Sequence, residues 1–184
     1  MISSAVFLAV QILLLFGLYS KGYLDYMRSL AVATYMWVLY SYLEIKYHVY
    51  MDNYVRMAVM VAVISDGFFG YYLNYYADSF IFDKVQHVFG SYAFALFAYI
   101  LVMQLSPGSD RNRTFRFILI TCLGISIGML YEIVEFLVDM FAKPIISSQP
   151  SLLDTDLDMI CDVIGSALAA AQAVFTRFPQ VEDS

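Results

Sequence analysis

The sequence has little positive charge and few cysteines. Its 184 residues include 10 lysine and arginine residues against 16 acidic ones, and charged residues make up 14% of the chain. Nucleic-acid-binding proteins concentrate lysine and arginine, so we expect no nucleic-acid partner. The two cysteines, Cys122 and Cys161, fall within apolar segments. A thiol there behaves as a small hydrophobic group, so we expect neither a disulfide nor a redox role.

Apolar side chains, in contrast, are abundant: 61% of the residues are hydrophobic and 17% are aromatic. A transmembrane helix needs about 20 predominantly apolar residues. The sequence therefore predicts an all-α integral membrane protein, a polytopic helix bundle in a single domain over residues 1–184. About six transmembrane helices are expected, at residues 3–20, 29–46, 54–76, 83–105, 115–141 and 156–176.

Two of these segments need comment. The first has no basic region before it and no convincing small-residue cleavage site after it, so we interpret it as a retained helix and not as a signal peptide. The second ends in Glu44, Lys46 and His48, which places its end at the membrane interface and leaves open whether it crosses fully. Arg111 and Arg113 then favour a cytoplasmic location for both termini.

The last segment combines acidic and apolar residues. If its helix begins near Thr155, Asp158 and Asp162 lie one turn apart on one face, with Asp154 at the helix start. An ionised acid at the membrane centre costs about 3 kcal/mol on the translocon scale. We therefore expect both carboxylates to face protein or a water-filled cavity, where they mark a functional site.

Three other segments bring polar residues to the same half of the membrane. Gly124 and Gly128 permit close helix packing in lipid, and their face of the helix also carries two glutamates. The polar residues of the three segments are Asp66, Gly70 and Asn74 in the third, Asp83, Lys84, His87 and Gly90 in the fourth, and Glu132 and Glu135 in the fifth.

Several of these residues also have a purely structural explanation. Asp83 and Asp154 could cap their helices. Asp66 could be a lone buried acid bonded to tyrosine or asparagine, and Asp139 and Asp156 are expected in solvent. The other acids are harder to explain in this way, since few lysines lie near enough to neutralise them.

A shared site of these acids could exist in three ways. It could bind one or two divalent metal ions such as Zn, Mg or Mn, because carboxylates and imidazole are ordinary ligands. It could hold protonated acids as a proton relay, or receive a cationic headgroup. For the first alternative, the predicted metal ligands are Asp83, His87, Glu132, Glu135, Asp158 and Asp162.

These motifs are similar to those of a known family. Phe82-Asp83-Lys84-xx-His87, Tyr131-Glu132-xx-Glu135 and Asp154-Thr155-xx-Asp158-xxx-Asp162-xx-Gly165 resemble YjdF-like bacterial inner-membrane proteins of unknown function and, more distantly, VanZ-like proteins. The resemblance covers about the last hundred residues. The approach to the last helix departs from that family, because it reads Ser147-Ser148-Gln149-Pro150-Ser151-Leu152. The resemblance implies a multi-pass inner-membrane protein and marks the same site residues.

Three functions remain open at this stage. The first is a metal-dependent enzyme acting on a lipid or lipid-linked substrate, with His87 or Glu135 as the proton carrier. The second is a proton- or cation-coupled transporter in which Asp66 forms part of a relay. The third is a non-catalytic accessory protein whose acids only organise the bundle. The lipid bilayer is the expected surrounding in each case, and the oligomeric state stays open.

Overall fold

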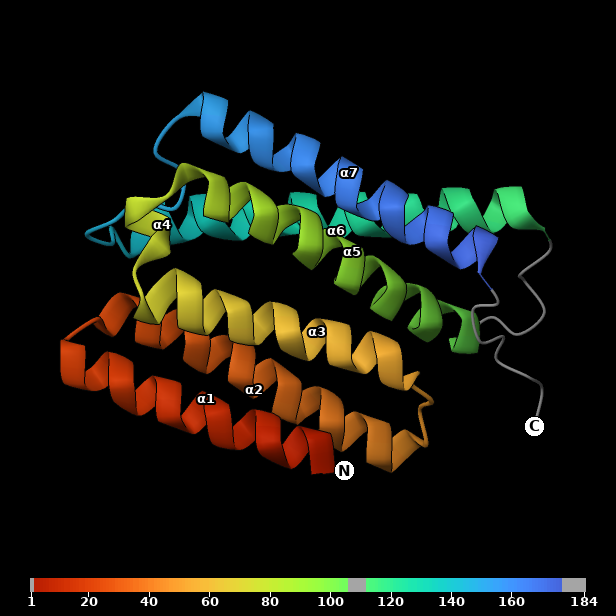
Figure 1. The fold of residues 1–184 in the computed structure, drawn as a ribbon, viewed down its shortest axis with the longest axis horizontal. Helices are drawn as coiled ribbons and strands as arrows, with labels where there is room; N and C mark the ends of the chain where they lie inside the picture. Colours follow the sequence, from red (N-terminus) through yellow and green to blue (C-terminus); the bar gives the residue numbers. More distant parts are fainter. Residues whose placement is uncertain (1, 106–111, 177–184) are drawn as a thin grey trace.

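The computed structural model describes residues 2–105 and 112–176, and every regular element within them is helical (Figure 1). The expectation of an all-α bundle is confirmed for this part of the chain. The elements are α1 (Ile2–Lys21), α2 (Leu24–Tyr47), α3 (Asn53–Ser65), the π-helical segment η1 (Asp66–Tyr72), α4 (Tyr75–Asp78), α5 (Phe80–Leu105), α6 (Arg113–Phe141) and α7 (Leu152–Phe175).

The long helices run side by side and alternate in direction (Figure 1). Helices α1, α2 and α3 form one side of the bundle, while α5, α6 and α7 form the other. The start of α5, the end of α6 and the start of α7 lie at the same end of the molecule. The start of α1 and the end of α7 lie at the opposite end, because the chain runs along the bundle an even number of times.

Five helical segments are long and apolar enough to cross a membrane: Ser3–Lys21, Asn53–Tyr72, Phe80–Leu105, Arg113–Phe141 and Leu152–Phe175. The predicted count of six is therefore approximate. Helix α2 was expected to be a span but is not among these five segments. Its 24 residues nevertheless pack against its neighbours, because Trp37 contacts Phe7 of α1 with ring centroids 5.1 Å apart and Glu44 forms an ion pair with Arg56 of α3.

Helix α7 packs closely against both α5 and α6, as the small residues predict. A Cβ atom on Gly165 would collide with the backbone carbonyl of Val88 in α5, and one on Gly128 in α6 would collide with the Asp162 side chain. Only glycine leaves the room for these approaches. This packing seam, formed at Gly128 and Gly165, sets the spacing of α5, α6 and α7, the three helices that carry the acids.

The end of the bundle away from the acids has an apolar core. Val55, Leu96, Ile120 and Ala169 are buried there and come from α3, α5, α6 and α7. In lipid the contact is stabilised by the close van der Waals packing of these side chains, because the surrounding acyl chains are as apolar as the residues themselves. The acids of the opposite end consequently sit on a scaffold whose helices are already fixed.

The third predicted span departs from a continuous α-helix. From Asp66 the helix widens into η1, in which Leu73 N donates to Phe68 O, five residues back, at 2.9 Å. Asn74 then adopts a left-handed backbone conformation, with φ of 64°, and the helical segment ends before it. The expected stripe is therefore wrong at Asn74, which lies outside the helix, whereas Asp66 and Gly70 both face Tyr76. Short π-helical segments are frequent at functional sites.

Candidate functional site

The first turns of α5 carry Asp83, Lys84 and His87. The helix begins at Phe80, and the backbone N–H of Phe82 donates to the Ser79 hydroxyl at 3.3 Å. Asp83 therefore lies inside the first turn, and its interpretation as the cap is wrong. Asp83 and His87 are four residues apart and face the same side, with Oδ1 and Nε2 3.7 Å apart.

Helix α7 buries three aspartates at spacings of four. Asp154, Asp158 and Asp162 are only 5%, 2% and 3% exposed. The cap of this helix is Ser151, whose hydroxyl accepts from the Asp154 N–H at 3.2 Å, so the capping explanation of Asp154 is also wrong. Asp156 is exposed, as expected. The buried aspartates form a continuous acidic face on two turns of α7.

Helix α6 adds Glu132, which is 5% exposed, and Glu135, which is half-buried. Ligand atoms of His87, Glu132 and Glu135 lie within 4.8 Å of one another, and so do those of Asp83, His87 and Asp158. Acids from three helices thus meet around one histidine. We term the following residues the carboxylate cluster: Asp83, His87, Glu132, Glu135, Asp154, Asp158 and Asp162.

Lys84 is the principal positive charge beside the carboxylate cluster. Its ammonium lies 2.8 Å from Asp83 Oδ2, 2.5 Å from Asp154 Oδ1 and 2.7 Å from Asp158 Oδ1. The lysine side chain is only 12% exposed. A buried ammonium is tolerated when it is paired in this way. The lysine contacts three of the six carboxyl groups, so the cluster has an excess of acidic groups over this lysine.

The imidazole of His87 lies at the centre of the carboxylate cluster. Its Nε2 atom is 3.6 Å from Asp158 Oδ1, 3.7 Å from Asp83 Oδ1 and 3.8 Å from Glu132 Oε1. These distances are too long for hydrogen bonds. The tetrahedron of donor atoms around an ion with bonds of about 2.2 Å has edges of about 3.6 Å. Each oxygen therefore lies at a ligand-like distance from Nε2, and mutual distances within 4.8 Å are found in two sets that share His87, one with Asp83 and Asp158 and one with Glu132 and Glu135.

Asp162 lies beside the other ring nitrogen of His87, Nδ1. Its Oδ1 lies 3.2 Å from His87 Nδ1 and also accepts a hydrogen bond from the hydroxyl of Ser91. A carboxylate on the far nitrogen fixes the tautomer and orientation of a metal-binding histidine. Asp162 is thus placed behind the imidazole, and Nε2 is directed toward the remaining carboxylates.

A loop residue that the sequence did not point to holds Glu132. The side-chain amide of Gln149 donates to Glu132 Oε2 at 2.8 Å and to the Glu132 carbonyl at 2.9 Å. Asp139 fixes this loop by accepting from the Ser147 hydroxyl at 2.5 Å and from the Ser148 and Gln149 N–H groups at 3.0 and 2.8 Å. Asp139 is therefore a loop anchor, and its interpretation as a solvated acid is incomplete.

Asp66 belongs to a neighbouring tyrosine cluster. Its Oδ1 accepts from the hydroxyl of Tyr76 at 2.5 Å, and Tyr71 interacts with both Asp66 and Tyr131. The alternative of a buried acid bonded to tyrosine fits this arrangement. Burial raises the pKa of Tyr76, in the short helix α4, well above its ordinary value, so its hydroxyl stays protonated and remains a donor. Tyr131 connects the two clusters, because its ring stands edge-on to His87 with centroids 5.8 Å apart.

In the described part of the chain, three buried oxygens of the carboxylate cluster lack a hydrogen bond, and one of them, Asp158 Oδ1, is instead ion-paired with Lys84 at 2.7 Å. Glu132 Oε1 and Asp162 Oδ2 have no hydrogen-bond partner among the described residues. Leaving a buried charged acceptor unpaired costs more than about 1–3 kcal/mol. These oxygens and the excess of acidic groups make the cluster suited to a cation.

Comparison with known proteins identifies a family of membrane proteins. Residues 2–178 match the family described as "Predicted membrane protein (DUF2238)". An uncharacterised protein of Thermotoga maritima is 30% identical over 118 residues, which cover 64% of this chain and 60% of the relative. No solved structure matches the chain. The chain belongs to the DUF2238 family of predicted membrane proteins.

Proposed function

We propose that this family member binds a divalent metal ion in the carboxylate cluster. The ligands would be His87 Nε2 and one carboxylate oxygen each from Asp83 and Asp158, whose ligand atoms all lie within 4.8 Å of one another. Glu132 Oε1, 3.8 Å from the same nitrogen, would complete the set by closing on the ion. Asp162 would orient His87 from behind, a role that its distances favour over the direct ligation predicted from the sequence. Zn, Mg and Mn remain the candidate ions, since imidazole suits Zn and carboxylates suit Mg and Mn.

The observation that carries this proposal is the equal spacing of three carboxylate oxygens from one imidazole nitrogen, at 3.6, 3.7 and 3.8 Å. The three oxygens come from three helices, so local sequence does not impose their convergence. The other nitrogen of the ring is occupied by a carboxylate, as in most metal-binding histidines.

The charge of the cluster supports the same conclusion. A divalent ion would offset part of the excess of six carboxyl groups over one lysine, and it would give the Glu132 Oε1 atom a partner. Lys84 pairs with Asp83 through Oδ2 and leaves Oδ1 of that group facing His87. Its ammonium lies 2.7 and 2.8 Å from the two oxygens of Asp158, so an ion would share Asp158 with Lys84.

A metal ion here would suit chemistry on a lipid or lipid-linked group. His87 lies seven residues from the start of α5, or about 10 Å along the helix axis, which places it just below the headgroups in a membrane. A bound ion polarises an oxygen of the substrate and lowers the pKa of a bound water. Glu135 would then serve as the proton carrier, since His87 would be a ligand.

The cellular setting belongs to the same proposal. The resemblance to YjdF-like and VanZ-like proteins supports a location in the bacterial inner membrane. Cytoplasmic termini would place the carboxylate cluster near the outer leaflet, because it lies at the end of the bundle opposite to both described ends of the chain.

Transport is the weaker alternative. A relay through Asp66 would have to continue along α3 toward the other end of the bundle. The buried face of α3 is apolar there, with Val55, Ala58, Val59 and Met60 buried. This face offers no groups that exchange protons.

Equilibrium dialysis of the purified protein against Zn, Mn and Mg tests the metal proposal. We expect one ion per chain, and loss of that ion in Asp158→Asn. The matched control is Asp156→Asn, which removes an exposed acid two residues away on the same helix. Absence of stoichiometric metal, or equal binding by both variants, would remove the proposal.

A further inference from the structure

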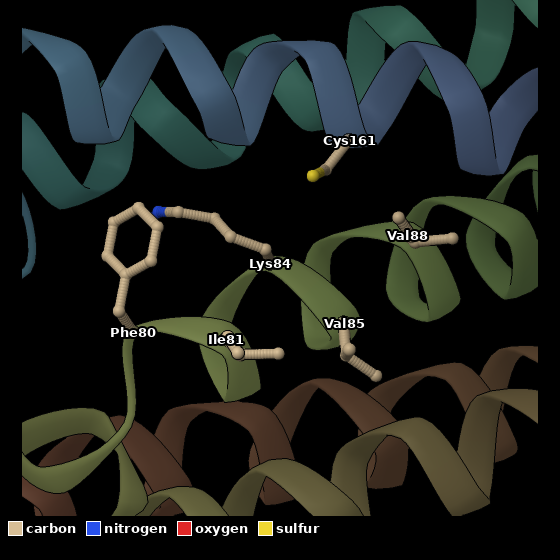
Figure 2. A pocket seen from close by; sticks show the side chains of 6 residues that line it. All are labelled: Phe80, Ile81, Lys84, Val85, Val88 and Cys161. Atoms are coloured by element: carbon tan, nitrogen blue, oxygen red, sulfur yellow. The ribbon is translucent and has the colours of Figure 1, made fainter.

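A shallow apolar groove of about 290 Å³ runs between the start of α5 and α7 (Figure 2). It is lined by Phe80, Ile81, Lys84, Val85, Val88 and Cys161. The first five come from α5, and Cys161 reaches toward the groove from α7 (Figure 2). The only charged lining residue is Lys84, whose ammonium lies 4.8 Å from the centroid of the Phe80 ring.

The groove faces lipid. Both of its helices belong to candidate membrane spans, and Phe80, Ile81 and Val85 are 58%, 72% and 58% exposed. Lys84 lies four residues from the start of α5, or about 6 Å along the axis, so the groove lies at the boundary between headgroups and acyl chains. In a bilayer the surrounding molecules at this depth are phospholipids.

Lys84 joins the groove to the carboxylate cluster. Its aliphatic stem lines the groove, while its ammonium contacts Asp154 and Asp158 at 2.5 and 2.7 Å. A lipid with one chain in the groove would therefore bring its headgroup to the cluster. Lys84, the charged group nearest the groove, suits the phosphate of such a lipid, and the carboxyl groups of Asp154 and Asp158 beyond it suit an ammonium. A headgroup that carries an ammonium is favoured over a purely anionic one.

We propose that the groove holds one acyl chain of a phosphatidylethanolamine-type lipid, whose headgroup lies against the carboxylate cluster. This inference rests on the proposed function and identifies the substrate class of the same site as an aminophospholipid that enters sideways from the bilayer. The groove supplies the apolar contact, and the carboxylate cluster selects the headgroup.

Native mass spectrometry of the full chain, equilibrated with equal amounts of phosphatidylethanolamine and phosphatidylglycerol in detergent, tests the inference. We expect retention of phosphatidylethanolamine over phosphatidylglycerol by about fivefold, the scale of one charge interaction at a membrane surface. Val85→Trp fills the groove from an exposed position and should abolish retention. Ile133→Trp, at a lipid-exposed position of α6, should leave it unchanged.

Cys161 gives a second readout that does not depend on lipid surviving transfer to the gas phase. In the Cys122→Ser background, phosphatidylethanolamine should slow alkylation of Cys161 by N-ethylmaleimide, and phosphatidylglycerol should slow it less. Equal retention of the two lipids, or equal retention by Val85→Trp and Ile133→Trp, would overturn the inference.

Metal content measured on the same samples separates the two proposals. Val85→Trp should keep its metal ion while losing lipid, since none of the proposed ligands is changed. A protein that holds metal but shows no groove-dependent lipid retention contradicts the inference alone. A protein that retains the lipid but no metal contradicts the proposed function, and the groove is then only a lipid-binding site.

Discussion

Gln149 donates its side-chain amide to both the carbonyl and the Oε2 atom of Glu132, at 2.9 and 2.8 Å. This fork leaves Glu132 Oε1 directed toward His87 Nε2, 3.8 Å away. A loop between α6 and α7 thus sets the orientation of a residue buried in α6. The relationship makes Gln149 a positioning residue of the carboxylate cluster.

Gln149→Ala should weaken metal binding without abolishing it. Groups that orient a ligand contribute about 10- to 100-fold to metal affinity, and Glu132 keeps its carboxylate in this variant. Isothermal titration calorimetry with the ion that binds wild type measures the change. Gln104→Ala is the matched control, because Gln104 bonds to the backbone of Tyr50 outside the carboxylate cluster. Equal affinity of both variants would show that Gln149 has no positioning role.

Asp162→Asn should also reduce metal affinity by about 10- to 100-fold, because the amide orients the imidazole of His87 less firmly than the carboxylate does. Asp158→Asn should reduce it further, since a proposed ligand is replaced. Competition with a chelating dye resolves the order of the two effects. A larger loss in Asp162→Asn would assign direct ligation to Asp162, as the sequence alone predicted.

Lys84→Met should lower the free energy of unfolding of the metal-free protein by about 3–5 kcal/mol, because it leaves Asp83, Asp154 and Asp158 without their buried counter-charge. Added divalent metal should recover part of this loss by supplying positive charge. Unfolding in mixed detergent micelles, with and without metal, measures both. Lys46→Met serves as control, since within residues 2–105 and 112–176 Lys46 forms only cation–π contacts with exposed tyrosines. Equal destabilisation by the two variants would contradict the burial argument.

Gly165→Ala should destabilise the bundle by about 1–3 kcal/mol. The added methyl group would meet the backbone carbonyl of Val88, which cannot move aside as a flexible side chain could. Gly90→Ala in α5 should be neutral or stabilising, because a Cβ there meets nothing within 4 Å and alanine favours helix. Thermal unfolding of the two purified variants measures the difference. Equal midpoints would show that the seam between α5 and α7 tolerates extra volume.

The sequence was sufficient to predict the helices and most members of the cluster. Apolar length indicated the spans, and the spacing of four placed Asp158 and Asp162 on one face. The convergence on His87 could be expected only in outline, because helix rotation and depth follow from packing at positions such as Gly165. Only the structure shows that Asp162 lies behind His87 whereas Asp158 faces its Nε2 atom.

Hydropathy does not indicate several other features of the structure. The widening at Asp66 is accompanied by a tertiary contact at its end, the hydrogen bond from Lys21 Nζ to the Tyr72 carbonyl at 2.8 Å. Gln149 lies in a polar loop without periodicity, so nothing local indicates its contact with Glu132. The start of α7 is different: Ser151-x-x-Asp154 is a recognisable capping sequence, and it could have placed the helix start at Leu152.

X-ray absorption spectroscopy of the metal-loaded protein is the most direct measurement of the central claim, that His87 and carboxylates from three helices surround one ion. The account predicts a first shell of one imidazole nitrogen and several oxygens at about 2.0–2.2 Å, with the imidazole signal lost in His87→Gln. A shell of oxygen alone, unchanged in His87→Gln, would contradict it.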